Sequence, residues 1–166
     1  MIHGIHHVAL ATGQLDRMVD FYCEALGFQL VYRSAWEKGS VQIDEMVGLP
    51  DSAARTAMLR SDSVFVEMFE YSSPSGKAGD PDRPVCDHGY THFCLWVSDI
   101  DAEHERLRGA GMRFHCPPHP APDPPGRGAV RSVYGRDPDG NVIELLELLD
   151  PRSSLRLPPE LMQSGR

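Results

Sequence analysis

The chain has 166 residues, 41% hydrophobic and 24% charged, which is typical of a folded domain with a substantial core. The formal net charge of -8 argues against general binding to nucleic acid or to anionic membrane surfaces, because both require dense Lys and Arg. No apolar run approaches the ~20 residues of a membrane span, and the N-terminus lacks a basic segment followed by an apolar core. We therefore expect a cytoplasmic protein.

The first half of the chain predicts the order strand, helix, strand, strand, strand. Apolar residues repeat at spacings of three and four only in the helical segment, and they alternate in the strands. The expected elements are a strand over 1–11, a helix over 16–26 and strands over 28–34, 57–60 and 64–71. Between 35 and 55 the pattern weakens, which predicts a long connection that shapes a pocket mouth and holds a short helix near 43–47.

The second half predicts the same order after a linker over 72–87, which is rich in Ser, Gly, Pro and Asp. Strand and helix are expected between 90 and 111, a further strand from Phe114, and the last two strands over 129–134 and 141–148. Six prolines in 117–126 predict a loop without strand pairing, since proline lacks the backbone donor. The segment 151–166 has no strong pattern, which predicts a frayed tail or an arm lying on a partner subunit.

The two halves are copies of one pattern. His7 and His92 each open an apolar strand that runs into a helix, and Asp16 and Asp101 follow at the same offset. Such self-similarity indicates an internally duplicated domain. We predict one domain over 1–150, with module one at 1–71, the linker at 72–87, module two at 88–150 and a tail at 151–166.

The four cysteines, Cys23, Cys86, Cys94 and Cys116, lie far apart without a C-x-x-C pair. This spacing favours free thiols over disulfides or metal ligands. Cys23 and Cys94 fall in apolar patterns, so we expect their thiols to be buried.

Two histidines and two glutamates occupy matching positions in the copies. Neighbouring residues of a strand point to opposite faces, so His6 and His7 cannot share a cleft, and the match to His92 selects His7. Glu67 and Glu144 share strand faces with apolar side chains, where a carboxylate is costly unless it is paired or binds a cation. The alternative is that both point outward, leaving other glutamates of the same strands available: Glu70 and Glu147.

Two imidazoles and two carboxylates form a ligand set that suits Fe(II), Mn(II), Co(II), Ni(II) or Zn(II). With four protein ligands, an octahedral ion keeps two open positions. A substrate with two adjacent oxygens can fill them. The four matched residues therefore predict one divalent metal ion.

The pattern resembles a known family. The histidine-apolar-x-Leu strand, the aliphatic-Asp pair and the segment Asp137 to Leu145 (DPDGNVIEL) are similar to the vicinal oxygen chelate superfamily of glyoxalases, bleomycin resistance proteins and dioxygenases. The resemblance implies an α+β fold, with two βαβββ modules forming an open eight-stranded barrel-like sheet around a metal cleft. It also implies a homodimer and the metal ligands His7, Glu67, His92 and Glu144.

Several segments are similar to the cyclitol epimerases that act on 2-epi-5-epi-valiolone: 21–28, 36–40, 69–74 and 87–92. We therefore predict an isomerase that removes and returns a proton next to the carbonyl of an α-hydroxyketone. Glu144 is expected to act as the base and Glu67 to reprotonate from the other face, with the metal as Lewis acid.

Other functions of the same superfamily stay open. A glyoxalase I-type lyase or a methylmalonyl-CoA epimerase would use the same proton transfer, but both bind anionic carriers and the sequence has few clustered basic residues. An extradiol dioxygenase and a metal-free ligand-binding or resistance protein are further alternatives. For a small-molecule substrate, the expected pocket residues are Trp36, Tyr71, Tyr90, Arg131 and Tyr134.

Overall fold

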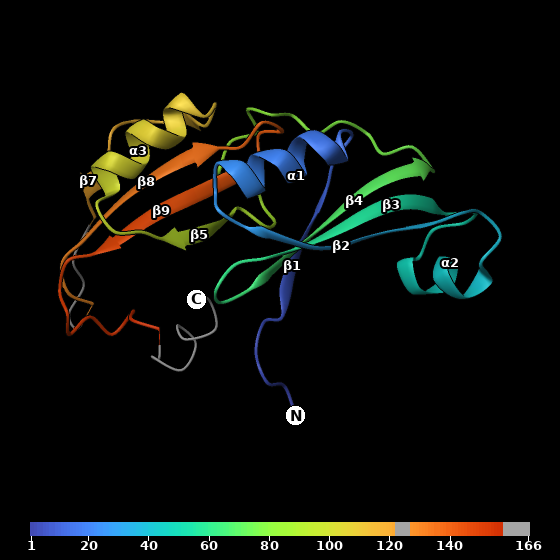
Figure 1. Cartoon of the computed structure of the whole chain (residues 1–166), viewed down its shortest axis with the longest axis horizontal. Coiled ribbons are helices and arrows are strands. Elements are labelled where there is room, and N and C mark those ends of the chain that lie inside the picture. Colours follow the sequence, from blue (N-terminus) through green and yellow to red (C-terminus); the bar gives the residue numbers. More distant parts are fainter. Residues whose placement is uncertain (122–126, 158–166) are drawn as a thin grey trace. The chain divides into compact units, whose positions relative to one another are not determined.

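The computed structural model describes residues 1–121 and 127–157 (Figure 1). Its described residues divide into two compact units, one over residues 1–78 and one over residues 79–157. The division falls within the predicted linker. Each unit is described by itself below.

The first unit contains one four-stranded sheet with the order β1-β4-β3-β2. Strand β1 pairs with β4 in parallel, and the other two pairings are antiparallel. In Figure 1, the short helix α2 lies beyond the ends of β2 and β3. The elements are β1 (His7–Ala11), α1 (Leu15–Glu24), β2 (Gln29–Trp36), α2 (Val41–Val47), β3 (Ala53–Arg60) and β4 (Phe65–Ser73).

The second unit repeats this topology, with the sheet order β5-β9-β8-β6 and a parallel pairing of β5 with β9. A fifth strand, β7, also pairs with β8. The elements are β5 (His92–Trp96), α3 (Ile100–Gly109), β6 (Arg113–Phe114), β7 (His119–Pro120), β8 (Val130–Arg136) and β9 (Val142–Leu148). The predicted α+β class and paired modules are confirmed. The eight-stranded sheet is corrected to two sheets of four and five strands, without a closed barrel among the described residues.

In the first unit, α1 packs on one face of the sheet, against β3 and β4. Met18 and Tyr22 of the helix and Leu59 and Val66 of the strands are completely or almost completely buried. Burial of each such apolar side chain stabilises the fold by about 1.5–3 kcal/mol. This face, called the helix face below, therefore supplies most of the unit's hydrophobic stabilisation.

The second unit has a helix face of the same kind. Helix α3 packs against β9 and β6, and Ile100, Leu107, Ile143 and Leu145 are buried there. The helix begins at a cap, because the Asp99 carboxylate accepts a hydrogen bond from the backbone N–H of Ala102 at 3.2 Å. In both units the opposite face of the sheet carries the matched histidine and glutamate, and it is called the site face.

Several predicted boundaries were wrong in the first unit. Strand β1 begins at His7 instead of residue 1, β2 continues to Trp36, and β3 begins at Ala53, so the long connection spans only 37–52. The residues 53–57 pair with β2 on one side and β4 on the other. This pairing on both sides outweighs the weak local pattern of the segment.

The predicted proline-rich loop also contains a short strand. His119 and Pro120 form β7, opposite Ser132 and Arg131 of β8. The pairing at one edge of β8 is possible because His119 keeps a backbone donor and an edge strand tolerates proline. Residues 122–126 of that loop lie outside the described residues.

The second half of the predicted linker belongs to the second unit. Arg136 donates a hydrogen bond to the carbonyl of Arg83 at 2.7 Å, and Arg113 donates to Asp82 at 2.9 Å. A Cβ atom at Gly140, whose φ is 91°, would lie 2.4 Å from the backbone of Pro81. The turn between β8 and β9 therefore requires glycine at position 140, because the backbone of the linker at Pro81 lies too close for a side chain.

The start of the predicted tail is ordered against the second unit. The Ser153 hydroxyl donates to the carbonyl of Arg127, and the Arg156 guanidinium lies 5.4 Å from the ring centre of Trp96. Residues 151–157 thus have contacts within the second unit, residues 158–166 lie outside the described residues, and a frayed tail or an arm on a partner subunit stays a prediction.

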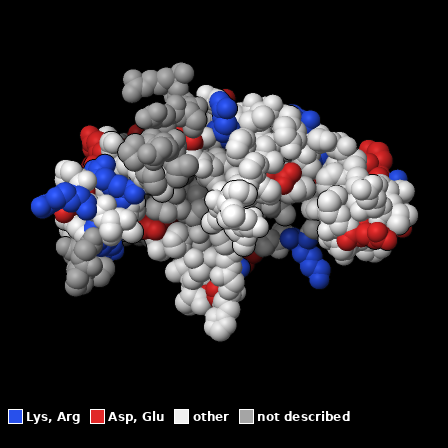
Figure 2. Space-filling model, turned by 90° about the horizontal axis from the view of Figure 1, so that it is seen from below, with Lys and Arg blue, Asp and Glu red and all other residues white. Residues whose placement is uncertain are grey.

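Among the helices of residues 1–121 and 127–157, none is long and apolar enough to cross a membrane. On the face shown in Figure 2, Lys and Arg side chains form separate groups instead of one continuous basic surface.

Candidate metal centre

The first candidate pair lies on neighbouring parallel strands of the first unit. His7 of β1 is opposite Phe65 of β4, and Glu67 follows two residues later, on the same side of the sheet. The His7 Nε2 atom lies 3.5 Å from the Glu67 Oε2 atom, and both side chains are only partly exposed. The register of β1 and β4 therefore brings an imidazole and a carboxylate together on the site face.

The second unit contains the same arrangement. His92 of β5 is opposite Val142 of β9, and Glu144 follows two residues later. The His92 Nε2 atom lies 3.2 Å from the Glu144 Oε2 atom. The exposed fractions are 25% for His92 and 18% for Glu144, so small molecules and ions can reach both.

The two distances are compatible with two ligands of one cation and are longer than a strong charge-assisted hydrogen bond. A charge-assisted N–H···O bond is about 2.7–2.9 Å long. Metal bonds of about 2.1 Å place neighbouring ligand atoms roughly 3.0 Å apart in an octahedral ion and roughly 3.4 Å apart in a tetrahedral one. The nitrogen–oxygen distances of 3.2 and 3.5 Å lie in or close to this range. Each pair is therefore spaced like two adjacent metal ligands.

Within the described residues, His, Cys, Asp and Glu side chains form no group of three or more able to hold a metal ion. The predicted ligands are therefore described as two separate pairs, one in each unit.

In both units the residue before the histidine contacts its Nδ1 atom. The His6 Nδ1 atom lies 3.0 Å from Nδ1 of His7, and the Thr91 hydroxyl lies 2.9 Å from Nδ1 of His92. A ligand imidazole needs such a partner for its second nitrogen, which orients the ring and selects its tautomer. Here Nε2 of each ring points at the glutamate.

The other glutamates of the same strands lie on the helix faces. Glu70 accepts a hydrogen bond from the backbone N–H of Leu15 at 3.3 Å, and Glu147 accepts one from Asp99 at 2.7 Å. Each thus bonds a backbone amide at or next to the first residue of its unit's helix, where a carboxylate is favourable. These contacts argue against Glu70 and Glu147 as metal ligands. They also explain why both copies have a glutamate three residues after the candidate ligand.

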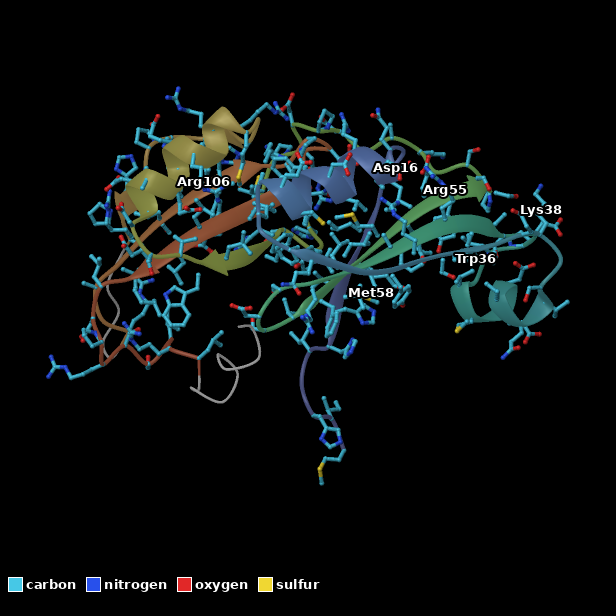
Figure 3. The ribbon with its side chains drawn as sticks, in the orientation of Figure 1. Asp16, Trp36, Lys38, Arg55, Met58 and Arg106 are labelled. Carbon is cyan, nitrogen blue, oxygen red and sulfur yellow. The ribbon has the colours of Figure 1, made fainter. Side chains whose placement is uncertain are left out.

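Arginine and aspartate side chains complete these contacts on the helix faces. Arg55 binds Asp16 and Glu70 in the first unit, and Arg131 binds Asp101 through two bonds of 2.6 and 2.8 Å in the second. Figure 3 shows Asp16 and Arg55 together on the α1 side of the sheet, whereas Trp36 and Met58 are labelled on its other side. Hydrogen bonds from the arginines hold the pKa values of Asp16 and Asp101 below their ordinary value.

The two site faces differ in the residues next to the glutamates. Ala9 and Met58 are opposite Glu67, whereas Cys94 and Tyr134 are opposite Glu144. Burial and then the Glu144 charge raise the pKa of Cys94 to about 12, although its residue keeps solvent access. The Cys94 residue as a whole is exposed, so the prediction that it is buried was wrong, although neighbouring atoms desolvate its thiol. Cys23 is partly buried, and all four cysteines are free thiols.

Tyr134 stands beside the pair of the second unit. Its ring centre lies 4.7 Å from that of His92, and burial and then the Glu144 charge raise the pKa of its hydroxyl. The hydroxyl therefore stays protonated at neutral pH and can donate a hydrogen bond.

The family model described as the glyoxalase/bleomycin resistance protein/dioxygenase superfamily matches residues 4–145. A 2-epi-5-epi-valiolone epimerase from Actinomyces sp is 34% identical over 87% of this chain and 79% of the relative. The chain belongs to this superfamily. A probable lactoylglutathione lyase from Synechocystis is 24% identical, with 85% of this chain and 92% of the relative covered.

Solved structures share the fold of this chain. A glyoxalase family protein from Bacillus cereus superposes with a TM-score of 0.76 at 23% identity, covering 90% of this chain and 97% of the other. A fosfomycin resistance protein from Listeria monocytogenes superposes with a TM-score of 0.55 at 17% identity, covering 89% and 94%. At these identities, the similarities show the fold alone.

Trp36 and Tyr71, two of the predicted pocket residues, meet in an aromatic cluster with Phe69. The ring centres of Trp36 lie 5.8 Å from Tyr71 and 6.2 Å from Phe69, and the Trp36 indole donates to the Ser52 hydroxyl at 3.0 Å. Phe69 and Tyr71 alternate with buried helix-face residues of β4, as Glu67 does, so the cluster shares the site face with that carboxylate.

The remaining predicted pocket residues are placed differently. Arg131 lies on the helix face, three residues from Tyr134, and is held by Asp101. Tyr90 precedes β5 and is 62% exposed. A role of either residue in substrate binding stays a prediction.

The partners of the two imidazoles, His6 and Thr91, and the neighbour of Glu144, Cys94, were not predicted from the sequence as site residues. His6 and Thr91 occupy equivalent positions of the two copies, one residue before each matched histidine, which is the signal that points to them. Cys94 is equivalent to Ala9, so comparison of the two copies shows a thiol in the second where the first has only a methyl group.

Proposed function

We propose that the protein is a divalent-metal-dependent epimerase acting next to the carbonyl of a vicinal-oxygen substrate. The observation that carries this proposal is the repeated pair of Nε2 and Oε2 atoms, 3.5 and 3.2 Å apart, on equivalent strands. The 34% identity to a 2-epi-5-epi-valiolone epimerase supports the reaction class.

The proposed metal ligands are His7, Glu67, His92 and Glu144. Two imidazoles and two carboxylates suit Fe(II), Mn(II), Co(II), Ni(II) or Zn(II), and the atom spacing within each pair fits adjacent ligand positions. A bound ion of this kind would act as a Lewis acid that polarises the substrate carbonyl.

The glutamates are proposed to transfer the proton. Glu144 takes the proton from the carbon next to the carbonyl, and Glu67, protonated at the start, gives its proton to the opposite side of that carbon, which inverts the stereocentre. Proton exchange of both carboxyl groups with water then restores the starting state. The asymmetry of their neighbours supports distinct roles, because a protonated Tyr134 hydroxyl and the Cys94 thiol lie beside Glu144 only.

The substrate is proposed to be an uncharged cyclitol-type α-hydroxyketone. Arg131 is bound by Asp101, and Arg136 donates to the carbonyls of Gly140 and Arg83, so these two basic groups already have partners within the chain. Arg127 is the exception, because its Nε and Nη2 atoms are buried without a hydrogen-bond partner among the described residues. The two engaged arginines support an uncharged substrate over an anionic carrier such as glutathione or coenzyme A, which needs several basic groups.

The test is deuterium exchange in D2O with metal analysis of the purified protein. The panel contains 2-epi-5-epi-valiolone and simpler α-hydroxyketones, a glutathione hemithioacetal and an acyl-CoA thioester. We expect exchange and epimerisation only with the α-hydroxyketones, in a sample that carries a divalent metal. If the metal-loaded protein exchanges none of the α-hydroxyketones, the proposal is contradicted.

A lactoylglutathione lyase is the second candidate, because several relatives near 25% identity carry that name. Exchange with the hemithioacetal alone would favour it. Oxygen uptake on catechols would favour a dioxygenase, since a biphenyl-2,3-diol 1,2-dioxygenase from Rhodococcus globerulus is also 25% identical. Tight ligand binding without metal or turnover would favour a binding or resistance protein. The proposed homodimer is checked by light scattering.

A further inference from the structure

We propose that His6 and Thr91 are paired positioning residues, one in each copy, that accept the Nδ1–H of the two candidate ligand histidines. The inference rests on the proposed metal site. It assigns a role to two residues outside the four ligands, and neither role depends on contact with the substrate.

The geometry of His6 is fixed from two sides. Its ring stacks on Phe65, with ring centres 4.9 Å apart and an angle of 7° between the planes. Its carbonyl accepts a hydrogen bond from the backbone N–H of Phe65 at 3.1 Å. The His6 Nδ1 atom is thereby held 3.0 Å from Nδ1 of His7, on the side of the ring away from Glu67.

Thr91 performs the same task with different chemistry. Its hydroxyl lies 2.9 Å from Nδ1 of His92, whose ring is also flanked by Tyr134 at 4.7 Å between ring centres. His6 and Thr91 occupy equivalent positions, so the two copies have different side chains at one geometric position.

The acceptor is needed only when Nε2 binds a metal. A neutral imidazole carries one N–H, so metal coordination through Nε2 places the hydrogen on Nδ1. An acceptor held at about 3 Å then fixes the ring plane and makes Nε2 a stronger ligand. A hydroxyl and an imidazole nitrogen can each accept this hydrogen bond. Loss of such a partner typically weakens metal binding by about 10–100-fold.

The experiment uses the full-length chain with Co²⁺ as the probe. His6→Phe keeps a ring to stack on Phe65 but removes the acceptor, and Thr91→Val keeps the shape of the side chain but removes the hydroxyl. The matched controls His6→Asn and Thr91→Ser keep an acceptor. Binding is measured by titration against a competing chelator, and NMR records the exchangeable ring N–H signals that Co²⁺ shifts far from the normal range.

We expect the wild-type chain to show two shifted ring N–H signals. His6→Phe should lose one and Thr91→Val the other, each with about 10–100-fold weaker Co²⁺ binding, whereas the Asn and Ser variants should stay near wild type. If both acceptor-free variants bind Co²⁺ within twofold of wild type and keep both signals, the positioning role is overturned while the metal site stands. If the wild-type chain binds no Co²⁺, the metal site and the positioning role are both overturned.

Discussion

Replacement of Glu144 by Gln should abolish proton transfer without unfolding the protein. The two side chains have nearly the same volume, and that of Glu144 keeps 18% exposure on the site face, away from the core under α3. The matched control is Glu147→Gln, on the helix face of the same strand. Its amide oxygen can still accept the hydrogen bond from the backbone N–H of Asp99.

The expected magnitude follows from the role of the carboxylate. A positioned general base contributes about 10²–10⁴ in rate, which corresponds to about 2.7–5.5 kcal/mol of transition-state stabilisation. Glu144→Gln should therefore slow deuterium exchange at least a hundredfold. Glu147→Gln loses only the charge of one hydrogen-bond acceptor, so its free energy of unfolding should fall by about 1 kcal/mol at most and its exchange rate by less than twofold.

The assay follows deuterium incorporation into the substrate by NMR, with Co²⁺ in excess over all variants so that weaker metal binding does not limit the rate. Urea unfolding is measured in parallel. The reasoning is refuted if Glu144→Gln exchanges within tenfold of wild type, or if Glu147→Gln loses as much activity as Glu144→Gln.

Three further outcomes are expected. Removal of metal by a chelator should abolish activity, and addition of Co²⁺, Mn²⁺ or Ni²⁺ should restore it; full activity after verified removal would contradict the metal's role. A thiol with a pKa of about 12, as for Cys94, has only ~10⁻⁴ of its molecules in the thiolate form at pH 8. Iodoacetamide should therefore label Cys94 far more slowly than Cys86, which mass spectrometry can follow. Equal labelling rates would argue against the raised pKa of Cys94. Hydrogen bonds from Arg55 to Asp16 and from Arg131 to Asp101 lower the pKa values of the two aspartates in the folded state. The stability that these pairs add is therefore complete at pH values above the ordinary pKa of 3.8. It is lost as the pH falls through the lower folded-state pKa values. Urea titrations between pH 5 and 2 should show this loss, and Arg131→Met should flatten the curve; an unchanged curve would mean that the Asp101 pair adds no stability.

Duplication made much of the fold and of the candidate site predictable. One copy of a strand histidine followed by an aliphatic-Asp pair carries little information, but two copies selected His7 over His6 and matched Glu67 with Glu144. The structure brings each predicted histidine and glutamate together within its own unit, because the parallel registers of β1 with β4 and of β5 with β9 are the same.

Other features depend on contacts that local patterns do not encode. Glu67 and Glu70 lie three residues apart on one strand, so alternation separates them, but only the position of α1 shows which face is which. Arg131 was among the expected pocket residues, yet its spacing of three residues from Tyr134 places it on the helix face beside Asp101. The pairing of His119 and Pro120 with β8 likewise depends on a neighbouring strand.

We propose above that the two His–Glu pairs, one from each copy, hold a single divalent ion. The most direct test is the stoichiometry of Co²⁺ binding by isothermal titration calorimetry for the wild-type chain, His7→Ala and His92→Ala. We predict one tight site per chain in the wild type and loss of that site in both variants. Two sites per chain, or one tight site that persists in either variant, would contradict the claim.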